Sequence, residues 1–310
     1  MNRRQFAKAL GVAALGLGMH KVALPCSGSP PQVAITLDDF NWFDVPRLTA
    51  EERNRRLLDA LLTHRVKAAI FVAGRFVDNE TGQRLLSAWD KDGHMIGNHS
   101  YSHLYYHNVS FERFSQDLLR GEGVLKQHPQ FRKFFRFPFL KEGETRAKRD
   151  GMRAFLKEHG YRNGHVTIDA SDWYVDQRLR ARLDKNPKAL LSPYKDYYLD
   201  HLWERAVYYN DLSQKVLGRS VKHTLLLHHN VINGLFLGDV LSMFERKGWK
   251  LIDAEEAYTD EVFSSVPDIL PAGESIIWAL AKQTGRFDKL LRYPGEDSDY
   301  EKAKMDRLGL

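Results

Sequence analysis

Residues 33–39 read Val-Ala-Ile-Thr-Leu-Asp-Asp, a short run typical of a buried β-strand that leads directly into two acids. Residues 33–37 are therefore expected to form the first strand of the domain. Neighbouring carboxylates at a strand end repel each other unless a cation or a proton lies between them. Alone, such a pair is more often a turn or a helix N-cap than a functional site.

After this strand, short apolar runs alternate with stretches of helical periodicity. The predicted strands are residues 33–37, 68–72, 95–97, 134–137, 165–168, 224–228 and 250–252. The predicted helices are residues 51–64, 82–92, 111–127, 145–159, 199–217 and 235–247. This alternation predicts one parallel α/β domain, either a barrel or an open sheet, whose functional side chains gather at the carboxyl ends of the strands.

Two segments do not fit this simple alternation of strands and helices. Residues 174–222 are too long for a single crossover, and residues 258–310 form a tail rich in turn signals with one predicted helix at 275–282. Such additions either pack against the domain or shape the mouth of its site. The aromatic residues of the first segment are candidates for stacking on sugar rings, although packing is the more common role: Tyr194, Tyr197, Trp203 and Tyr208.

The histidines of the stretch His-Ser-Tyr-Ser-His at residues 99–103 point to metal chemistry. His99 and His103 are four residues apart, so a helical turn would place both imidazoles on one face. Such spacing arises by chance among 13 histidines. With a carboxylate from the first strand, however, the pair completes two imidazoles and one acid, which is the pattern of a catalytic metal site with an open position.

Three further groups stand at predicted strand ends. They are Arg136-Phe137-Pro138-Phe139, Asp169-Ala170-Ser171-Asp172-Trp173 and Leu225-Leu226-Leu227-His228. Taken singly, each is explained by a surface arginine, a capping aspartate pair or a histidine that ends a core strand.

In this order, the five motifs T-L-D-D, H-S-Y-S-H, R-F-P-F, D-A-S-D-W and L-L-H resemble those of the polysaccharide deacetylase (NodB-homology) family, carbohydrate esterase family 4. The resemblance spans about residues 33–255 and implies a distorted parallel (β/α) barrel of seven or eight strands. We therefore expect a barrel at residues 31–257 with a helical insertion at 174–222, and a C-terminal extension at 258–310 packed on it.

The resemblance also implies roles for individual residues. Asp39, His99 and His103 would bind a divalent metal, most often zinc, with Co²⁺, Mn²⁺ and Ni²⁺ as alternatives. Asp38 would be the general base that activates the attacking water, and the metal would stabilise the oxyanion that forms.

On the leaving-group side, the resemblance makes His228 the general acid, with Asp169 holding it charged and oriented. Arg136 would pair with Asp38 and keep it ionised. His229 is a rival for the acid, but strand alternation sends neighbours to opposite faces, and the register of the motif favours His228. The residues expected to line the substrate pocket are Phe139, Trp173 and Leu227.

The N-terminus has the features of an export signal. Residues 1–30 contain four cations and no acid, and an apolar run at 9–19 follows a twin Arg3-Arg4 pair, as in twin-arginine signals. The formal charge of +6 falls to +2 without this segment, so a nucleic-acid partner is not indicated. We expect a periplasmic protein, with lipid attachment at the single cysteine, Cys26, as a less favoured alternative that would tether the N-terminus to the membrane.

The expected activity is a zinc-dependent hydrolase that removes acetyl groups from an N- or O-acetylated polysaccharide or cell-envelope glycan. One alternative is removal of a formyl or other acyl group from a lipid-linked aminosugar. Another is a catalytically silent glycan-binding protein, which would be expected to lack at least one ligand or acid–base residue. No internal stretch has the 18 apolar residues of a membrane span.

Overall fold

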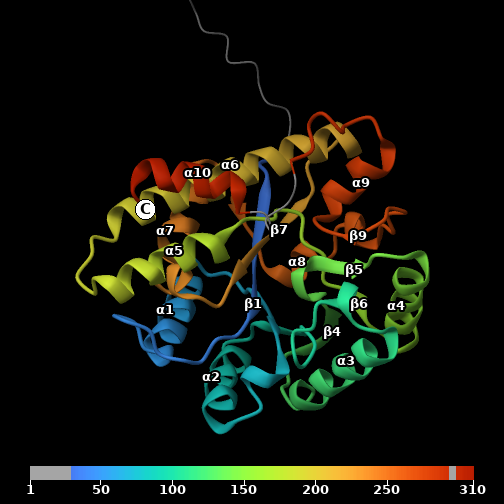
Figure 1. Cartoon of the computed structure of the whole chain (residues 1–310), viewed down its shortest axis with the longest axis horizontal. Coiled ribbons are helices and arrows are strands. Elements are labelled where there is room, and N and C mark those ends of the chain that lie inside the picture. Colours follow the sequence, from blue (N-terminus) through green and yellow to red (C-terminus); the bar gives the residue numbers. More distant parts are fainter. Residues whose placement is uncertain (1–28, 293–297) are drawn as a thin grey trace, which may run out of the picture.

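A seven-stranded parallel sheet lies at the centre of the molecule, with helices around it (Figure 1). The computed structural model describes residues 29–292 and 298–310, so the predicted export signal and Cys26 lie outside the described residues. The strands of this sheet are β1 (Gln32–Asp39), β2 (Ala69–Val72), β3 (Met95–Asn98), β4 (Phe131–Phe135), β6 (Arg162–Asn163), β7 (Lys222–His228) and β8 (Lys250–Leu251).

The sheet curls into a distorted (β/α) barrel, as expected. Its strand order is β6-β4-β3-β2-β1-β7, and β8 pairs with the first residues of β1. One short segment links the two edges of this order. It begins as β6, paired with β4, and a few residues later Ile168 forms a parallel bridge with Leu225 of β7. A single passage of chain therefore brings the ends of the sheet together.

The predicted strand at residues 165–168 is wrong, because this segment crosses from one edge of the sheet to the other. This stretch pairs with β7 through the bridge at Ile168, where Thr167 and Ile168 donate to the carbonyl of Thr224 and Ile168 accepts from the backbone N–H of Leu226. A segment that crosses from one edge to the other cannot pair with one neighbour over its whole length. The fourth predicted strand is displaced as well, because β4 ends at Phe135 and residues 136–137 already belong to the loop behind it.

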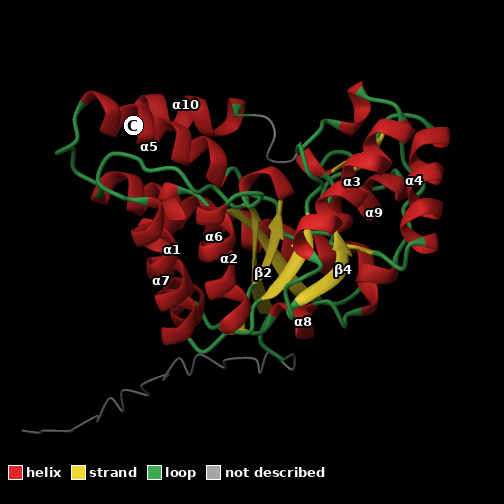
Figure 2. Ribbon diagram, turned by 90° about the horizontal axis from the view of Figure 1, so that it is seen from below, coloured by secondary structure: helices red, strands yellow, loops and turns green. Residues whose placement is uncertain are grey.

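Helices cover the outside of the sheet (Figure 2). They are α1 (Ala50–Thr63), α2 (Glu80–Lys91), α3 (Phe111–Leu125), α4 (Arg146–Glu158), α5 (Asp172–Lys185), α6 (Ser192–Leu217), α7 (Val231–Arg246), α8 (Ala254–Ala257), α9 (Ile276–Thr284) and α10 (Asp299–Leu308). Polar side chains cap the first four, since Thr49, Asn79, Ser110 and Thr145 each accept from a backbone N–H of the first turn. The seven predicted helices are present, but α5, the short α8 and α10 were not expected.

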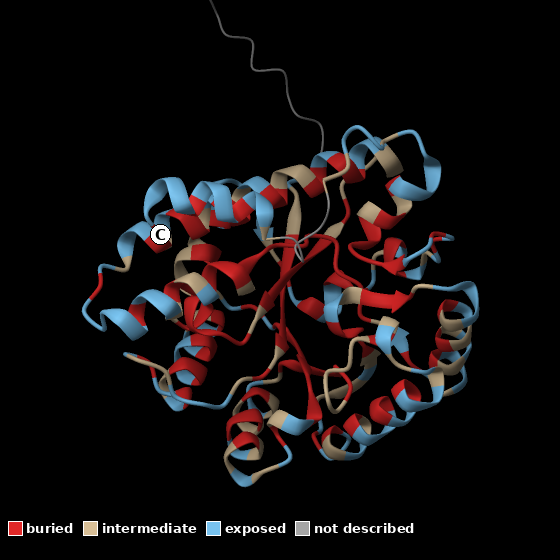
Figure 3. Ribbon diagram, in the orientation of Figure 1, coloured by how far each residue is buried: buried red, intermediate tan, exposed pale blue. Residues whose placement is uncertain are grey.

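Residues 174–222 pack into the body of the protein. They form most of α5 and all of α6, and α6 alone buries Tyr194 and Tyr197 to 3% and 7% exposure. Trp203 and Tyr208 are partly buried against the same core. These aromatics therefore act in packing rather than as exposed sugar platforms. In Figure 3 the strands and the inner faces of the helices are buried, and exposed residues lie on the outer faces of the helices.

The residues after Tyr258 contact both the barrel and α6. β9 (Ala272–Gly273) pairs antiparallel with β5 (Lys141–Gly143), α9 lies against α6, and α10 forms an ion pair between Lys304 and Glu204 of α6. Among the described residues, no helix combines the length and the apolar character needed to cross a membrane.

The ring of Phe71 fills the interior of the barrel beneath the site. A Cβ added at Gly97 would lie 2.6 Å from this ring, and one at Gly164 would lie 2.5 Å from it. The Arg136 guanidinium lies 4.0 Å from the centre of the same ring. The two glycines therefore leave the space that Phe71 needs in order to support Arg136.

Replacing Gly97 with alanine should overpack this interior. We expect the free energy of unfolding to fall by about 1–3 kcal/mol, as for other small-to-large changes in close-packed cores. Gly123→Ala is the matched control, because a Cβ at Gly123 meets nothing within 4 Å and alanine favours its helix. Urea unfolding of the wild type and of both variants is the measurement. A Gly97→Ala protein that is as stable as the wild type would contradict this packing.

Candidate active site

Asp38 and Asp39 end β1 with both carboxylates toward the same cavity. Neighbouring residues of a strand normally face opposite sides. Here the backbone turns into the left-handed region at Asp39 (φ 79°) and at Phe40 (φ 78°), and this brings the second carboxylate round to the first. The hydrogen bonds from Arg53 to the carbonyls of Asn41 and Phe43 hold the loop that follows.

His99 and His103 lie beside Asp39, although not on a helix. The residues after β3 form a turn in which Ser100 (φ 63°) and His103 (φ 56°) adopt left-handed backbone, so the expected helical turn is wrong while the expected proximity is present. His99 Nδ1 donates to the carbonyl of Arg136 at 2.8 Å, which leaves Nε2 as the free acceptor nitrogen. The two rings meet edge to face, 4.9 Å apart.

The donor atoms of these three residues suit a divalent cation. One ligand atom each from Asp39, His99 and His103 lies within 4.8 Å of the others. Asp39 Oδ1 is buried, has no hydrogen-bond partner among the described residues, and lies 3.2 Å from His103 Nε2. Burial lowers the pKa of both histidines to about 4, which favours the neutral imidazole that binds metals. The set therefore fits the expected metal.

Arg136 lies under Asp38, as expected. Its Nη1 donates to Asp38 Oδ1 at 2.7 Å and to the Thr36 hydroxyl at 2.9 Å, and the arginine is 1% exposed. Its Nη2 donates to the Tyr258 hydroxyl and its Nε to the carbonyl of Gly164. Burial raises the pKa of Asp38 to about 6 against the opposing charge of Arg136. Nothing in the sequence pattern pointed to Tyr258.

The carboxylate that holds His228 belongs to Asp172, so the prediction of Asp169 is wrong. His228 Nδ1 lies 2.7 Å from Asp172 Oδ1, and the His228 backbone N–H donates to Asp172 Oδ2. Burial alone would lower the pKa of His228, but the charge and hydrogen bond of Asp172 raise it to about 10. Asp169 lines the same cavity from the strand side. Both acids belong to the motif D-A-S-D-W, and the second begins α5, whose first turn faces His228.

The alternation of side chains along β7 decides which of two neighbouring histidines and which of two neighbouring leucines face the cavity. His229 is fully buried and stacks on Phe40 at 4.5 Å, so His228 is the histidine that reaches the cavity. Leu226 shares its face and lines the cavity, whereas Leu227 is fully buried on the opposite face. The prediction that Leu227 lines the pocket is therefore wrong by one residue.

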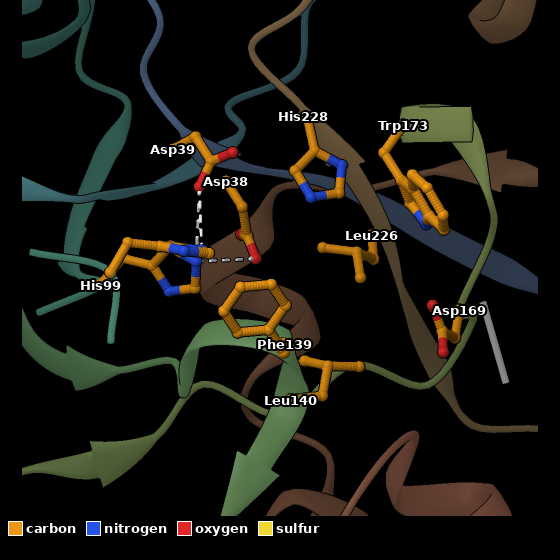
Figure 4. Close-up of a pocket in the computed structure, with 10 residues that line it drawn as sticks. Asp38, Asp39, His99, Phe139, Leu140, Asp169, Trp173, Leu226 and His228 are labelled. Atoms are coloured by element: carbon orange, nitrogen blue, oxygen red, sulfur yellow. Dashed lines mark ion pairs between the residues drawn. The ribbon is translucent and has the colours of Figure 1, made fainter. Parts of the chain in front are cut away.

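These side chains surround one cavity of about 400 Å³ (Figure 4). In Figure 4, Asp38, Asp39 and His99 lie on one side and Asp169 lies across from them. Apolar side chains complete the wall: Phe139, Leu140, Trp173 and Leu226. Phe139 is 42% exposed, and its ring packs edge to face on His103 at 4.7 Å. Phe139 and Trp173, two of the residues expected to line the substrate pocket, thus both line this cavity.

Part of the chain is similar to known proteins. The polysaccharide deacetylase family model matches residues 27–164. A peptidoglycan-N-acetylglucosamine deacetylase of Bacillus cereus is 28% identical over 158 residues, which are 50% of this chain and 52% of that protein. The chain spans about half the length of the curated relatives that it matches.

Solved structures share the fold. The chitin deacetylase of the fungal pathogen Colletotrichum lindemuthianum has a TM-score of 0.52 at 19% identity, over 74% of this chain and 88% of that one. A CE4 family pseudoenzyme from Bacillus anthracis has a TM-score of 0.51 at 19% identity, over 74% and 65%. With its motifs gathered at one edge of a curled parallel sheet, the chain contains a domain of the polysaccharide deacetylase family, matched over residues 27–164, and it shares the fold of the carbohydrate esterase family 4 structures.

Proposed function

We propose that this chain is a metal-dependent hydrolase that removes acetyl groups from an N- or O-acetylated glycan. One observation carries the proposal: three side chains able to hold a cation, the buried carboxylate of Asp38 and the imidazole of His228 line a single cavity. A relative named peptidoglycan-N-acetylglucosamine deacetylase supports an acetylated cell-envelope glycan as the substrate class.

Asp39, His99 and His103 would hold the cation, with zinc as the first choice. Such an ion supplies Lewis acidity toward the acyl carbonyl and the attacking water. Asp38 acts as the base through Oδ2, because Arg136 holds Oδ1. Arg136 also fixes the direction of this carboxylate, so the proton is accepted at a defined position.

His228 acts on the other side of the substrate. Asp172 holds Nδ1, so Nε2 is the atom that gives a proton to the departing amine or alkoxide. Because the pKa of His228 is raised to about 10, the imidazole is protonated at neutral pH and ready to act as an acid. Trp173 and Leu226 form the apolar wall that excludes water beside it.

Metal binding is tested on the purified full-length protein. We expect about one divalent ion per chain, acetate release from an acetylated glycan, and loss of that release after chelation. Asp39→Asn should weaken metal retention because it removes the anionic ligand. Elemental analysis is the measurement, and a fully metalated Asp39→Asn protein would contradict the ligand assignment.

Asp38→Asn tests the base separately from the metal. We expect kcat to fall by roughly 10²–10⁴-fold, the usual contribution of a general base, while the metal content stays at the wild-type level. Acetate release at saturating substrate is the measurement. Unchanged activity in this variant would remove Asp38 from the mechanism.

The pH dependence tests the acid. A raised pKa means that His228 stays protonated until the pH rises through that value, so activity should decline only near pH 10. Asp172→Asn removes the charge that raises the pKa, and the alkaline limb should move to lower pH. Asp169→Asn is the control and should leave that limb in place. If Asp169→Asn moved the alkaline limb and Asp172→Asn did not, Asp169 would be the partner of His228.

Two other functions are separated by product analysis. The fold also occurs in a protein described as a pseudoenzyme, so the fold alone does not establish catalysis. A catalytically silent protein would bind glycan and release no acid. A deformylase of a lipid-linked aminosugar would release formate in preference to acetate. A screen over chitin oligosaccharides, peptidoglycan, acetylxylan, an acetylated exopolysaccharide and formylated aminosugars distinguishes the three outcomes.

A further inference from the structure

One buried face of α6 carries three polar side chains that point toward the active site. Tyr198, His201 and Arg205 are spaced at i, i+3 and i+7, and they are 0%, 4% and 2% exposed. We call these three residues the α6 polar face. Buried polar groups need hydrogen-bond partners, so the partners of this face show what it does.

Two residues of the α6 polar face form hydrogen bonds to the turn that precedes α5. His201 Nε2 accepts from the backbone N–H of Ser171 at 3.0 Å. Arg205 Nε donates to the backbone carbonyl of Asp169 at 3.1 Å. The Ser171 side chain makes no capping hydrogen bond to α5. A donor and an acceptor from α6 therefore hold both sides of the turn that carries Asp172.

The third member acts from the opposite side of Asp172. The Tyr198 hydroxyl donates to Asn233 Oδ1 at 2.6 Å. This contact orients the Asn233 amide, whose Nδ2 donates to Asp172 Oδ2 at 2.9 Å and to the carbonyl of His228 at 2.9 Å. Tyr198 thus acts on both members of the Asp172–His228 pair through one asparagine.

The state of His201 suits its role as an acceptor. Burial keeps the pKa of His201 well below its ordinary value, and the nearby positive charges of Arg205, Arg292 and Lys304 act in the same direction. The imidazole is therefore neutral. Its Nδ1 lies 3.7 Å from a carboxylate oxygen of Glu301 on α10, which favours the tautomer with the proton on Nδ1 and leaves Nε2 free to accept.

We propose that the α6 polar face positions Asp172 and His228 for proton transfer. The proposal rests on the proposed function, in which His228 is the acid. Tyr198, His201 and Arg205 are positioning residues, because they act through the backbone of the 169–171 turn and through Asn233. The long insertion that carries α6 thus belongs to the catalytic apparatus as well as to the packed core.

The test compares four variants of the full-length protein. His201→Leu removes the acceptor at Ser171, whereas His201→Gln offers a carbonyl oxygen at a similar reach. Tyr198→Phe removes only the hydroxyl that orients Asn233. Ser213→Ala is the matched control, since Ser213 is equally buried on α6 and bonds only the carbonyls of Asn210 and Arg219.

The measurements are kcat and KM for acetate release, metal content, and the far-downfield proton NMR signal of the His228 Nδ1–H, assigned by its loss in His228→Ala. In His201→Leu and Tyr198→Phe we expect kcat to fall by about tenfold or more, because a misplacement near 1 Å is costly. The signal should shift or broaden, with KM and metal content unchanged. His201→Gln should recover most of both readouts, and Ser213→Ala should match the wild type.

Wild-type kcat and an unchanged proton signal in both His201→Leu and Tyr198→Phe would overturn the proposal. If His201→Leu does not fold, Tyr198→Phe and His201→Gln still decide it. If the wild type releases neither acetate nor formate from any substrate, the proposed function fails. The NMR signal, which needs no substrate, then decides alone whether α6 holds the Asp172–His228 pair.

Discussion

The buried guanidinium of Arg136 is the interaction on which the rest of the site depends. It contacts Asp38 and Thr36 on β1, Gly164 in the segment that links the sheet edges, and Tyr258 after α8. The carbonyl of the same residue fixes the ring of His99. Removing one partner of a buried ion pair commonly costs about 3–5 kcal/mol, so this single side chain ties the stability of the barrel to the geometry of Asp38.

Much of the site could be predicted because its chemistry is local in the sequence. Asp38 and Asp39 follow one strand directly, and His99 and His103 are four residues apart. Short loops at the carboxyl edge of a parallel sheet bring such groups together. The contact between Arg136 and Asp38 was expected from the resemblance of the motifs to the polysaccharide deacetylase family.

The errors share a different cause. Asp169 and Asp172 have the same side chain, so only the position at which α5 begins decides which of them contacts His228. The Ser171 side chain makes no capping hydrogen bond that would mark that position. Leu226 and Leu227 are chemically identical, so only the register of β7 decides which one faces the cavity. Residues 165–168 read as a strand, yet the segment to which they belong pairs with β4 only at residues 162–163 and with β7 only from Thr167 onward. Each of these choices is made by tertiary packing.

The pairing of β1 with β7 has a consequence for how the molecule forms. The Thr36 hydroxyl donates to the carbonyl of Leu225, 189 residues later, and Asp38 lies opposite His228 in the register of the two strands. Contacts between such distant parts of the chain are formed slowly, because the entropy of closing the intervening loop must be overcome first. During synthesis Asp38 is therefore made long before His228, and the two residues come together only after β7 has emerged and joined the sheet.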